Sequence, residues 1–182
     1  WLQSYFNAYL IPLVHCFYAH KLVFMPHGEN LILKLKNSVP VGAYMKDIGE
    51  EVALLNSTES LPEEVSRIHI AMPKELELLS IFTDVFDCFF RYLVAILVRE
   101  ARITEHDFWQ GVAQSVKAYQ QANPALNARF KEYDFFSDEF AHSCLNRLQL
   151  GNNKQMVDLT DPAGSLQFAG SLNNPVSAKL YG

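Results

Sequence analysis

Residues 24–30 read FMPHGEN, which places a histidine, a carboxylate and an amide side by side between two apolar stretches. Two further runs, LILKLKN and VPVGAYMKD, follow directly and have the composition of β-strands. The polar residues between these runs, around Asn37–Pro40, predict a β-hairpin. Its loop is expected to have two residues (Ser38 and Val39) or four, and both choices place Asn30 opposite Asp47.

Side chains that face each other across an antiparallel pair lie on one face, with Cβ atoms about 5 Å apart. The amide of Asn30 and the carboxylate of Asp47 are therefore expected to converge at the open end of the hairpin. Two oxygen ligands at that separation can hold one Mg²⁺, which keeps waters and substrate phosphates as further ligands.

The same plan occurs in protein kinases, where an Asn metal ligand precedes a hairpin that leads to a metal-binding Asp. HGEN differs from the kinase HRD signature, and the chain contains no DFG. The alternative is a hairpin end whose polar residues only satisfy one another. Glu50 and Glu51 also have two interpretations, as a solvated turn or as carboxylates near the metal.

The chain has 182 residues, of which 49% are hydrophobic and 19% charged, with a formal net charge of −5. This composition fits one domain with a substantial core. The negative charge argues against nucleic acid or an anionic membrane as the main partner. Cys16, Cys88 and Cys144 show no CxxC spacing and are expected to be buried, reduced thiols. Without a recognisable signal peptide, the sequence predicts a cytoplasmic protein.

The elements that must position the hairpin are mostly helical. Residues 1–20 predict a buried helix that Pro12 kinks or breaks. The apolar segment Leu78–Val98 contains Asp84, Asp87 and Arg91, so we expect a buried helix and not a membrane span. This helix is expected to begin near Pro73, and its phenylalanines at 82, 86, 89 and 90 are expected to lie in the core.

Three further segments complete the expected α+β, mostly helical fold. Asn56–Glu64 is expected to be a polar loop. Thr104 and Asp107 predict a capping box at the start of a helix that Asn123-Pro124 ends. Residues 135–150 predict a shorter helix capped by Ser137 or Asp134, and from Gly151 the composition predicts an irregular tail.

Segment Phe24–Glu51 resembles the C-terminal half of the NRPS-independent siderophore (NIS) synthetases, the aerobactin-synthetase family. The motif that carries the resemblance is HGxN followed by Lys46-Asp47, and the later helical segments and the closing NNPV are similar as well. The MPHGEN…MKDIGEE version resembles the hydroxamate branch, of the bisucaberin, alcaligin or desferrioxamine kind.

The resemblance implies a palm-fingers-thumb enzyme with a kinase-like palm. Residues 1–56 would form a palm segment and residues 57–182 a helical thumb region with its tail. Such enzymes use ATP to adenylate the succinyl carboxylate of an N-hydroxy-N-succinyl-diamine. They then join it to an amine and form amide-linked, in part macrocyclic, siderophores for iron acquisition.

Position by position, the resemblance assigns Asn30 and Asp47 to Mg²⁺ and, with Glu29, to ATP. His27 and Lys46 would be catalytic, with His27 beside the reacting carboxylate. Met25 stands where citrate-using members have Glu, which disfavours citrate, although a citrate-using synthetase stays an alternative.

The phosphate-binding Ser/Thr, Lys and Arg residues of the family lie upstream of this region. The resemblance therefore implies that the rest of the parent chain is a partner, that this chain alone is inactive, and that the enzyme is a homodimer. A kinase-like phosphotransferase segment and a non-catalytic helical module are the rival interpretations.

Overall fold

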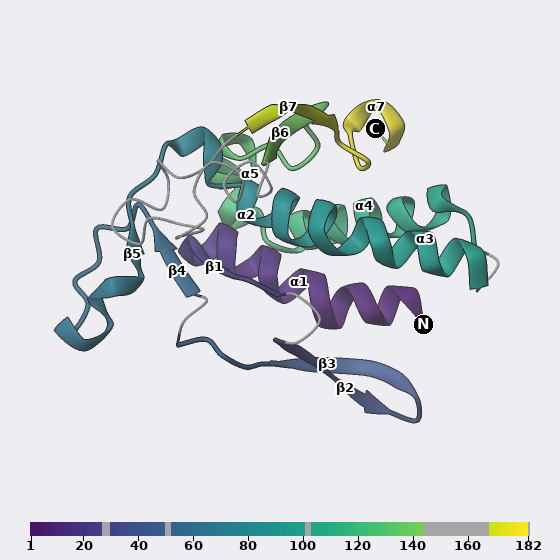
Figure 1. The fold of residues 1–182 in the computed structure, drawn as a ribbon, viewed down its shortest axis with the longest axis horizontal. Coiled ribbons are helices and arrows are strands. Elements are labelled where there is room, and N and C mark those ends of the chain that lie inside the picture. Colours follow the sequence, from purple (N-terminus) through teal and green to yellow (C-terminus); the bar gives the residue numbers. More distant parts are fainter. Residues whose placement is uncertain (27–29, 50–51, 101–102, 144–167, 182) are drawn as a thin grey trace, which may run out of the picture.

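Helix α1 (Leu2–His20) is the centre of the fold in the computed structural model, which describes residues 1–26, 30–49, 52–100, 103–143 and 168–181. It lies between helix α4 (Glu105–Ala122) on one side and the hairpin of β2 and β3 on the other (Figure 1). Nine of its apolar and aromatic side chains are buried, as its sequence predicts. The helix runs through Pro12 without a break and ends at Lys21, whose φ of 55° is left-handed.

The hairpin pairs β2 (Leu31–Lys36) with β3 (Val39–Met45), but in a different register from the expected one. Lys36 pairs with Val39, so the loop is the two residues Asn37 and Ser38, with φ of 51° and 62°. Positive φ at both positions is the condition for a type I′ turn, whose twist suits a hairpin. A bulge between Lys34 and Leu35 shifts the register again. The predicted pairing of Asn30 with Asp47 is therefore wrong.

A second, small sheet holds the segments that flank the hairpin. Its order is β1 (Leu22–Phe24), β4 (Val52–Leu55) and β5 (His69–Ile70), with β1 antiparallel and β5 parallel to β4. Most of the expected polar loop lies between β4 and the 3₁₀ helix η1 (Glu63–Ile68), and its last two residues, Glu63 and Glu64, belong to η1. Because β1 leads into the segment FMPHGEN, this sheet fixes where that segment begins.

The predicted long helix after Pro73 is present, but it changes type along its length. It comprises η2 (Lys74–Leu76), α2 (Leu79–Ile81), a π-helix (Phe82–Phe90) and α3 (Arg91–Glu100). Phe82, Phe86 and Phe90 are buried, and Phe89 packs against the same core. The π-helix meets α1 and α4 through close aromatic pairs, among them Phe90 with Phe108 at 5.4 Å between ring centroids.

The cysteines fit their prediction only in part. Cys16 and Cys88 are free thiols, and Cys16 is half-buried. Cys88 is exposed, because it lies on the outer face of the π-helix, so its predicted burial is wrong. Cys144 lies outside the described residues.

Both ends of α4 agree with the sequence. Thr104 Oγ1 accepts a hydrogen bond from the Asp107 amide at 3.0 Å, and Asp107 Oδ2 accepts one from the Thr104 amide at 3.0 Å. The helix ends at Ala122, before Asn123-Pro124, and continues as η4 (Pro124–Leu126) and α5 (Asn127–Glu132).

The C-terminal region differs most from expectation. Where a helix is predicted, residues Glu139–Ser143 form strand β6, which pairs antiparallel with β7 (Phe168–Asn173). Phe140 stacks on Phe82 at 4.7 Å, so the strand closes the core beside the π-helix. The described part of the predicted irregular tail is thus partly regular, with β7 beside β6 and the short helix α7 (Ala178–Tyr181) after β7 (Figure 1). The chain has a mixed α+β fold.

Candidate functional site

Three of the predicted site residues, Asn30, Lys46 and Asp47, lie at the open end of the β2–β3 hairpin. The backbone amide of Lys46 donates a hydrogen bond to the carbonyl of Asn30 at 2.9 Å. This bond continues the hairpin register by one pair, so Lys46 faces Asn30, and Asp47 follows one residue later.

Asn30 is almost completely buried, with 3% of its surface exposed. Its Nδ2 lies 3.4 Å from the carbonyl oxygen of Met25, at the weak end of hydrogen-bond distances. The contact joins two described residues, Met25 and Asn30, that lie on either side of residues 27–29 in the sequence. A buried amide held in this way can present its oxygen in a fixed direction.

Lys46 and Asp47 form an ion pair, with 2.7 Å between Nζ and Oδ2, and both side chains are about half exposed. Asp47 has a φ of 57°, in the left-handed region that Asp and Asn enter more readily than other L-residues. The strand therefore ends at Met45, and the carboxylate stands at the surface where a soluble ligand can reach it.

The other predicted residues of this site, His27 and Glu29, lie outside the described residues, as do Glu50 and Glu51. Within the described ranges, no group of three or more His, Cys, Asp or Glu side chains could hold a metal ion. A metal held by Asn30 and Asp47 would accordingly take most of its ligands from substrate and water, which is common for Mg²⁺.

Sequence reasoning missed Tyr9, which is buried in α1 and reaches the same loop. Its hydroxyl donates a hydrogen bond to the carbonyl of Pro26 at 2.5 Å. Burial raises the pKa of Tyr9 far above its ordinary value, and negative charge on Tyr5 and Asp84 raises it further. In sequence, Tyr9 is one of many aromatic residues on an apolar helix, and nothing there marks its hydroxyl.

Asp84 is the second unusual ionisable group in this area. It lies on the π-helix, and its burial raises the pKa of its carboxyl from 3.8 to about 7. The carboxyl therefore changes charge near neutral pH. It is close enough to Tyr9 for its negative charge to affect the tyrosine hydroxyl.

A cavity of about 610 Å³ adjoins this site, between α1 and the hairpin. Its walls are mostly apolar and include Tyr9, Phe24, Leu31 and Met45. Leu31 follows Asn30 in the sequence, and Met45 precedes Lys46. Sites for small molecules commonly combine apolar walls with a few polar groups in a volume of this size.

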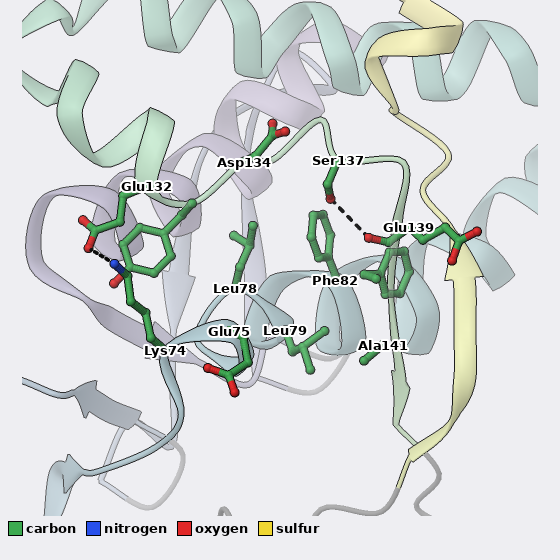
Figure 2. Close-up of a pocket in the computed structure, with 12 residues that line it drawn as sticks. Lys74, Glu75, Leu78, Leu79, Phe82, Glu132, Asp134, Ser137, Glu139 and Ala141 are labelled. Atoms are coloured by element: carbon green, nitrogen blue, oxygen red, sulfur yellow. Dashed lines mark hydrogen bonds and ion pairs between the residues drawn. The ribbon is translucent and has the colours of Figure 1, made fainter.

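A second cavity, of about 490 Å³, lies between α2 and β6 (Figure 2). Two of its acidic side chains, Glu132 and Glu139, have partners from other elements. Glu132 pairs with Lys74 at 2.7 Å, and Glu139 accepts a hydrogen bond from Ser171 at 2.5 Å. These pairings join the region's elements to one another, and they identify no ligand.

A buried polar network holds the start of β1 in place, and sequence reasoning missed it as well. Glu77, with 1% of its surface exposed, accepts hydrogen bonds from Lys21 Nζ at 3.3 Å and Asn56 Nδ2 at 2.6 Å. Asn56 also exchanges two hydrogen bonds with the backbone of Met72. Lys21 ends α1 and Asn56 follows β4, so the network ties both to the segment before α2.

None of the described helices combines the length and the apolar character needed to cross a lipid bilayer.

Comparison with known proteins adds a family. The family described as "Ferric iron reductase FhuF-like transporter" matches residues 1–158. A putrebactin synthase from Shewanella sp. (strain MR-4) is 51% identical over 178 residues, which cover 98% of this chain and 28% of that protein.

Two solved structures share the fold. Aerobactin synthetase IucC from Klebsiella pneumoniae has a TM-score of 0.77 at 22% identity, over 97% of this chain and 30% of its own. ATP-bound aerobactin synthetase IucA from the same species has a TM-score of 0.65 at 16% identity, over 98% of this chain and 30% of its own. The chain thus spans less than a third of the length of these relatives.

Proposed function

The chain belongs to the FhuF-like family, as the C-terminal part of an NIS synthetase, and we propose that it carries the Mg-ATP and acyl-group residues of a hydroxamate siderophore synthetase. In the proposed reaction, a carboxylate oxygen of an N-hydroxy-N-succinyl-diamine attacks the α-phosphorus of ATP, and pyrophosphate leaves. An amine nitrogen then attacks the acyl carbon, AMP leaves, and the nitrogen loses a proton as the amide forms.

The identity of 51% with a putrebactin synthase, over 98% of this chain, is the observation that carries the proposal. The family description names a ferric iron reductase and transporter instead, and we base the proposal on the identity with the synthase.

Asn30 and Asp47 suit Mg-ATP by their chemistry, because both carry oxygen ligands and both lie at the open end of the hairpin, although Lys46 and not Asp47 faces Asn30. Bound Mg²⁺ would neutralise phosphate charge. Lys46 already pairs with Asp47, so its ammonium group lies where it can also contact a phosphate. For His27 and Glu29 we propose the roles that the family resemblance implies, beside the acyl group and the nucleotide.

Several finer features belong to the same proposal. They are the kinase-like plan of the palm, its division from the thumb near residue 56, a homodimer and a cytoplasmic location. The upstream part of the parent protein would supply the phosphate-binding cations. We therefore expect the 182-residue chain alone to release no pyrophosphate from ATP in the presence of the substrate.

The nucleotide product tests the proposal. The full-length protein is given ATP, Mg²⁺ and N-hydroxy-N-succinylputrescine or its cadaverine analogue, and the nucleotides are separated by chromatography. AMP with pyrophosphate supports the ligase, whereas ADP supports a kinase-like phosphotransferase.

Two variants test the assigned site in the same assay. Asp47→Asn is expected to lower kcat/KM for ATP at least tenfold, because a neutral amide is a poorer ligand for Mg²⁺. Glu64→Gln, which changes an exposed carboxylate on η1, is the matched control and should leave kcat/KM unchanged. An unaltered Asp47→Asn enzyme would remove Asp47 from the site and favour the non-catalytic interpretation of the hairpin.

A further inference from the structure

We propose that Tyr9 is a positioning residue for the candidate site, because it holds the carbonyl of Pro26, next to Met25, which Asn30 contacts. The inference rests on the proposed function for its kinetic consequence. Its structural part concerns only the described residues on either side of the loop.

The tyrosine is itself held rigidly. Only 2% of its surface is exposed, and its ring stacks on Tyr5 at 5.4 Å between centroids. The rings of Phe89 and Phe90 pack against it at 5.4 Å each. Because α1 and the π-helix both hold the ring, its hydroxyl has a fixed position in the core.

The hydroxyl donates to Pro26 at 2.5 Å, in a buried environment. Proline has a restricted φ, so a hydrogen bond to its carbonyl leaves the Pro26 backbone little freedom. On the far side, Asn30 is held by the amide of Lys46 and contacts Met25. Three residues separate Pro26 from Asn30 in the sequence, and His27 is the first of them.

The hydroxyl stays a donor at all physiological pH values. Burial keeps the pKa of Tyr9 far above its usual range, and a negative charge on Asp84 raises it further. A phenylalanine at position 9 would fill the same space but would leave the buried carbonyl of Pro26 without this donor. The phenylalanine variant therefore tests the hydroxyl of Tyr9 while it keeps the packing of the ring.

Tyr18 provides a matched control on the same helix. Its hydroxyl is also buried and donates to a backbone carbonyl, that of Tyr133, at 2.6 Å. Tyr18→Phe and Tyr9→Phe therefore remove equivalent hydrogen bonds, but only Tyr9 reaches the segment before His27. A general loss of stability would affect the two variants alike.

The first measurement is hydrogen exchange in the full-length protein, read by mass spectrometry in peptides that cover residues 24–31. Tyr9→Phe is expected to speed exchange there on the order of tenfold, and Tyr18→Phe to leave it unchanged. This measurement does not depend on catalysis. Equal exchange in the wild type and Tyr9→Phe would overturn the proposal, whatever the enzyme turns over.

The second measurement is pyrophosphate release with ATP and the acyl substrate. Tyr9→Phe is expected to lower kcat on the order of tenfold with a smaller change in KM for ATP, while Tyr18→Phe keeps both. A wild-type protein without activity would contradict the proposed function. The hydrogen-exchange measurement alone would then test the role of Tyr9. An active wild type with equal kcat in both variants would show that Tyr9 has only a structural role.

Discussion

The ion pair of Lys21 with Glu77 gives a quantitative prediction about the support of the candidate site. The partners differ in burial, because the Lys21 side chain is 20% exposed and that of Glu77 only 1%. Removing Lys21 should therefore cost more than removing Glu77. Lys21→Met leaves a buried carboxylate with Asn56 as its hydrogen-bond donor, whereas Glu77→Leu leaves an ammonium group that can turn to water.

The magnitudes follow from this asymmetry. Breaking a fully buried pair by removing one partner costs about 3–5 kcal/mol, and we assign about 3 kcal/mol to Lys21→Met. Glu77→Leu should cost about 2 kcal/mol, because Asn56 keeps its bond to Met72. The double variant should cost less than the sum by about 2 kcal/mol, since neither charge is left alone.

Native-state hydrogen exchange of the full-length protein measures these changes in stability at the segments that Lys21 and Glu77 join. The amide of Leu55 donates to the carbonyl of Lys21 at 2.9 Å, so its opening free energy reports on the joined segments. Glu100→Ala, which removes the exposed partner of Arg99, should change the exchange by less than about 1 kcal/mol. Equal effects of Lys21→Met and Glu100→Ala would refute the argument from buried charge.

Two further predictions concern the core. In Gly111→Ala the new Cβ would lie 2.8 Å from Cε2 of Phe6, so overpacking should outweigh the gain in helix propensity and destabilise the protein by about 1 kcal/mol. In Gly42→Ala, the control, the new Cβ meets nothing within 4 Å. Thermal unfolding of the two variants measures the difference in stability. For Asp84, burial favours the neutral acid, so wild-type stability should fall as pH rises from about 4 to about 7 and then level off. Asp84→Asn should match the wild type at pH 4 and exceed it by about 2–4 kcal/mol at pH 8, and a constant difference across this range would contradict the assignment.

Signals that act within a few residues could be predicted from the sequence. The start and end of α4 follow from Thr104 with Asp107 and from Asn123-Pro124, and each contact joins residues close in the chain. The buried character of α1 follows from its composition. These features need no knowledge of what packs against them.

The hairpin register shows where such signals become insufficient. Asn37 tolerates a left-handed conformation, and this favours the turn found in the structure. Ser38 adopts the same conformation without a comparable preference. The turn moves the pairing by two residues from the expected register, and the bulge beside Leu35, which has no marker in the sequence, moves it back by one. An error of one residue was enough to place Asp47, in place of Lys46, opposite Asn30.

Strand β6 and the hydrogen bond of Tyr9 both depend on partners that are distant in the sequence. The partner of β6 is β7, which follows residues 144–167, so the local pattern of Glu139–Ser143 was also compatible with a helix. The bond from Tyr9 to Pro26 spans 17 residues and depends on how α1 packs beside β1. Three-dimensional packing decides both features.

The most direct test of the account is the product that the full-length enzyme makes from ATP, Mg²⁺ and an N-hydroxy-N-succinyl-diamine, read by mass spectrometry. We predict amide-linked hydroxamate oligomers or macrocycles, formed together with AMP, with the putrescine and cadaverine substrates compared to identify the preferred diamine. ADP as the nucleotide product, or no condensation with either substrate, would contradict the assignment of this chain to a hydroxamate siderophore synthetase.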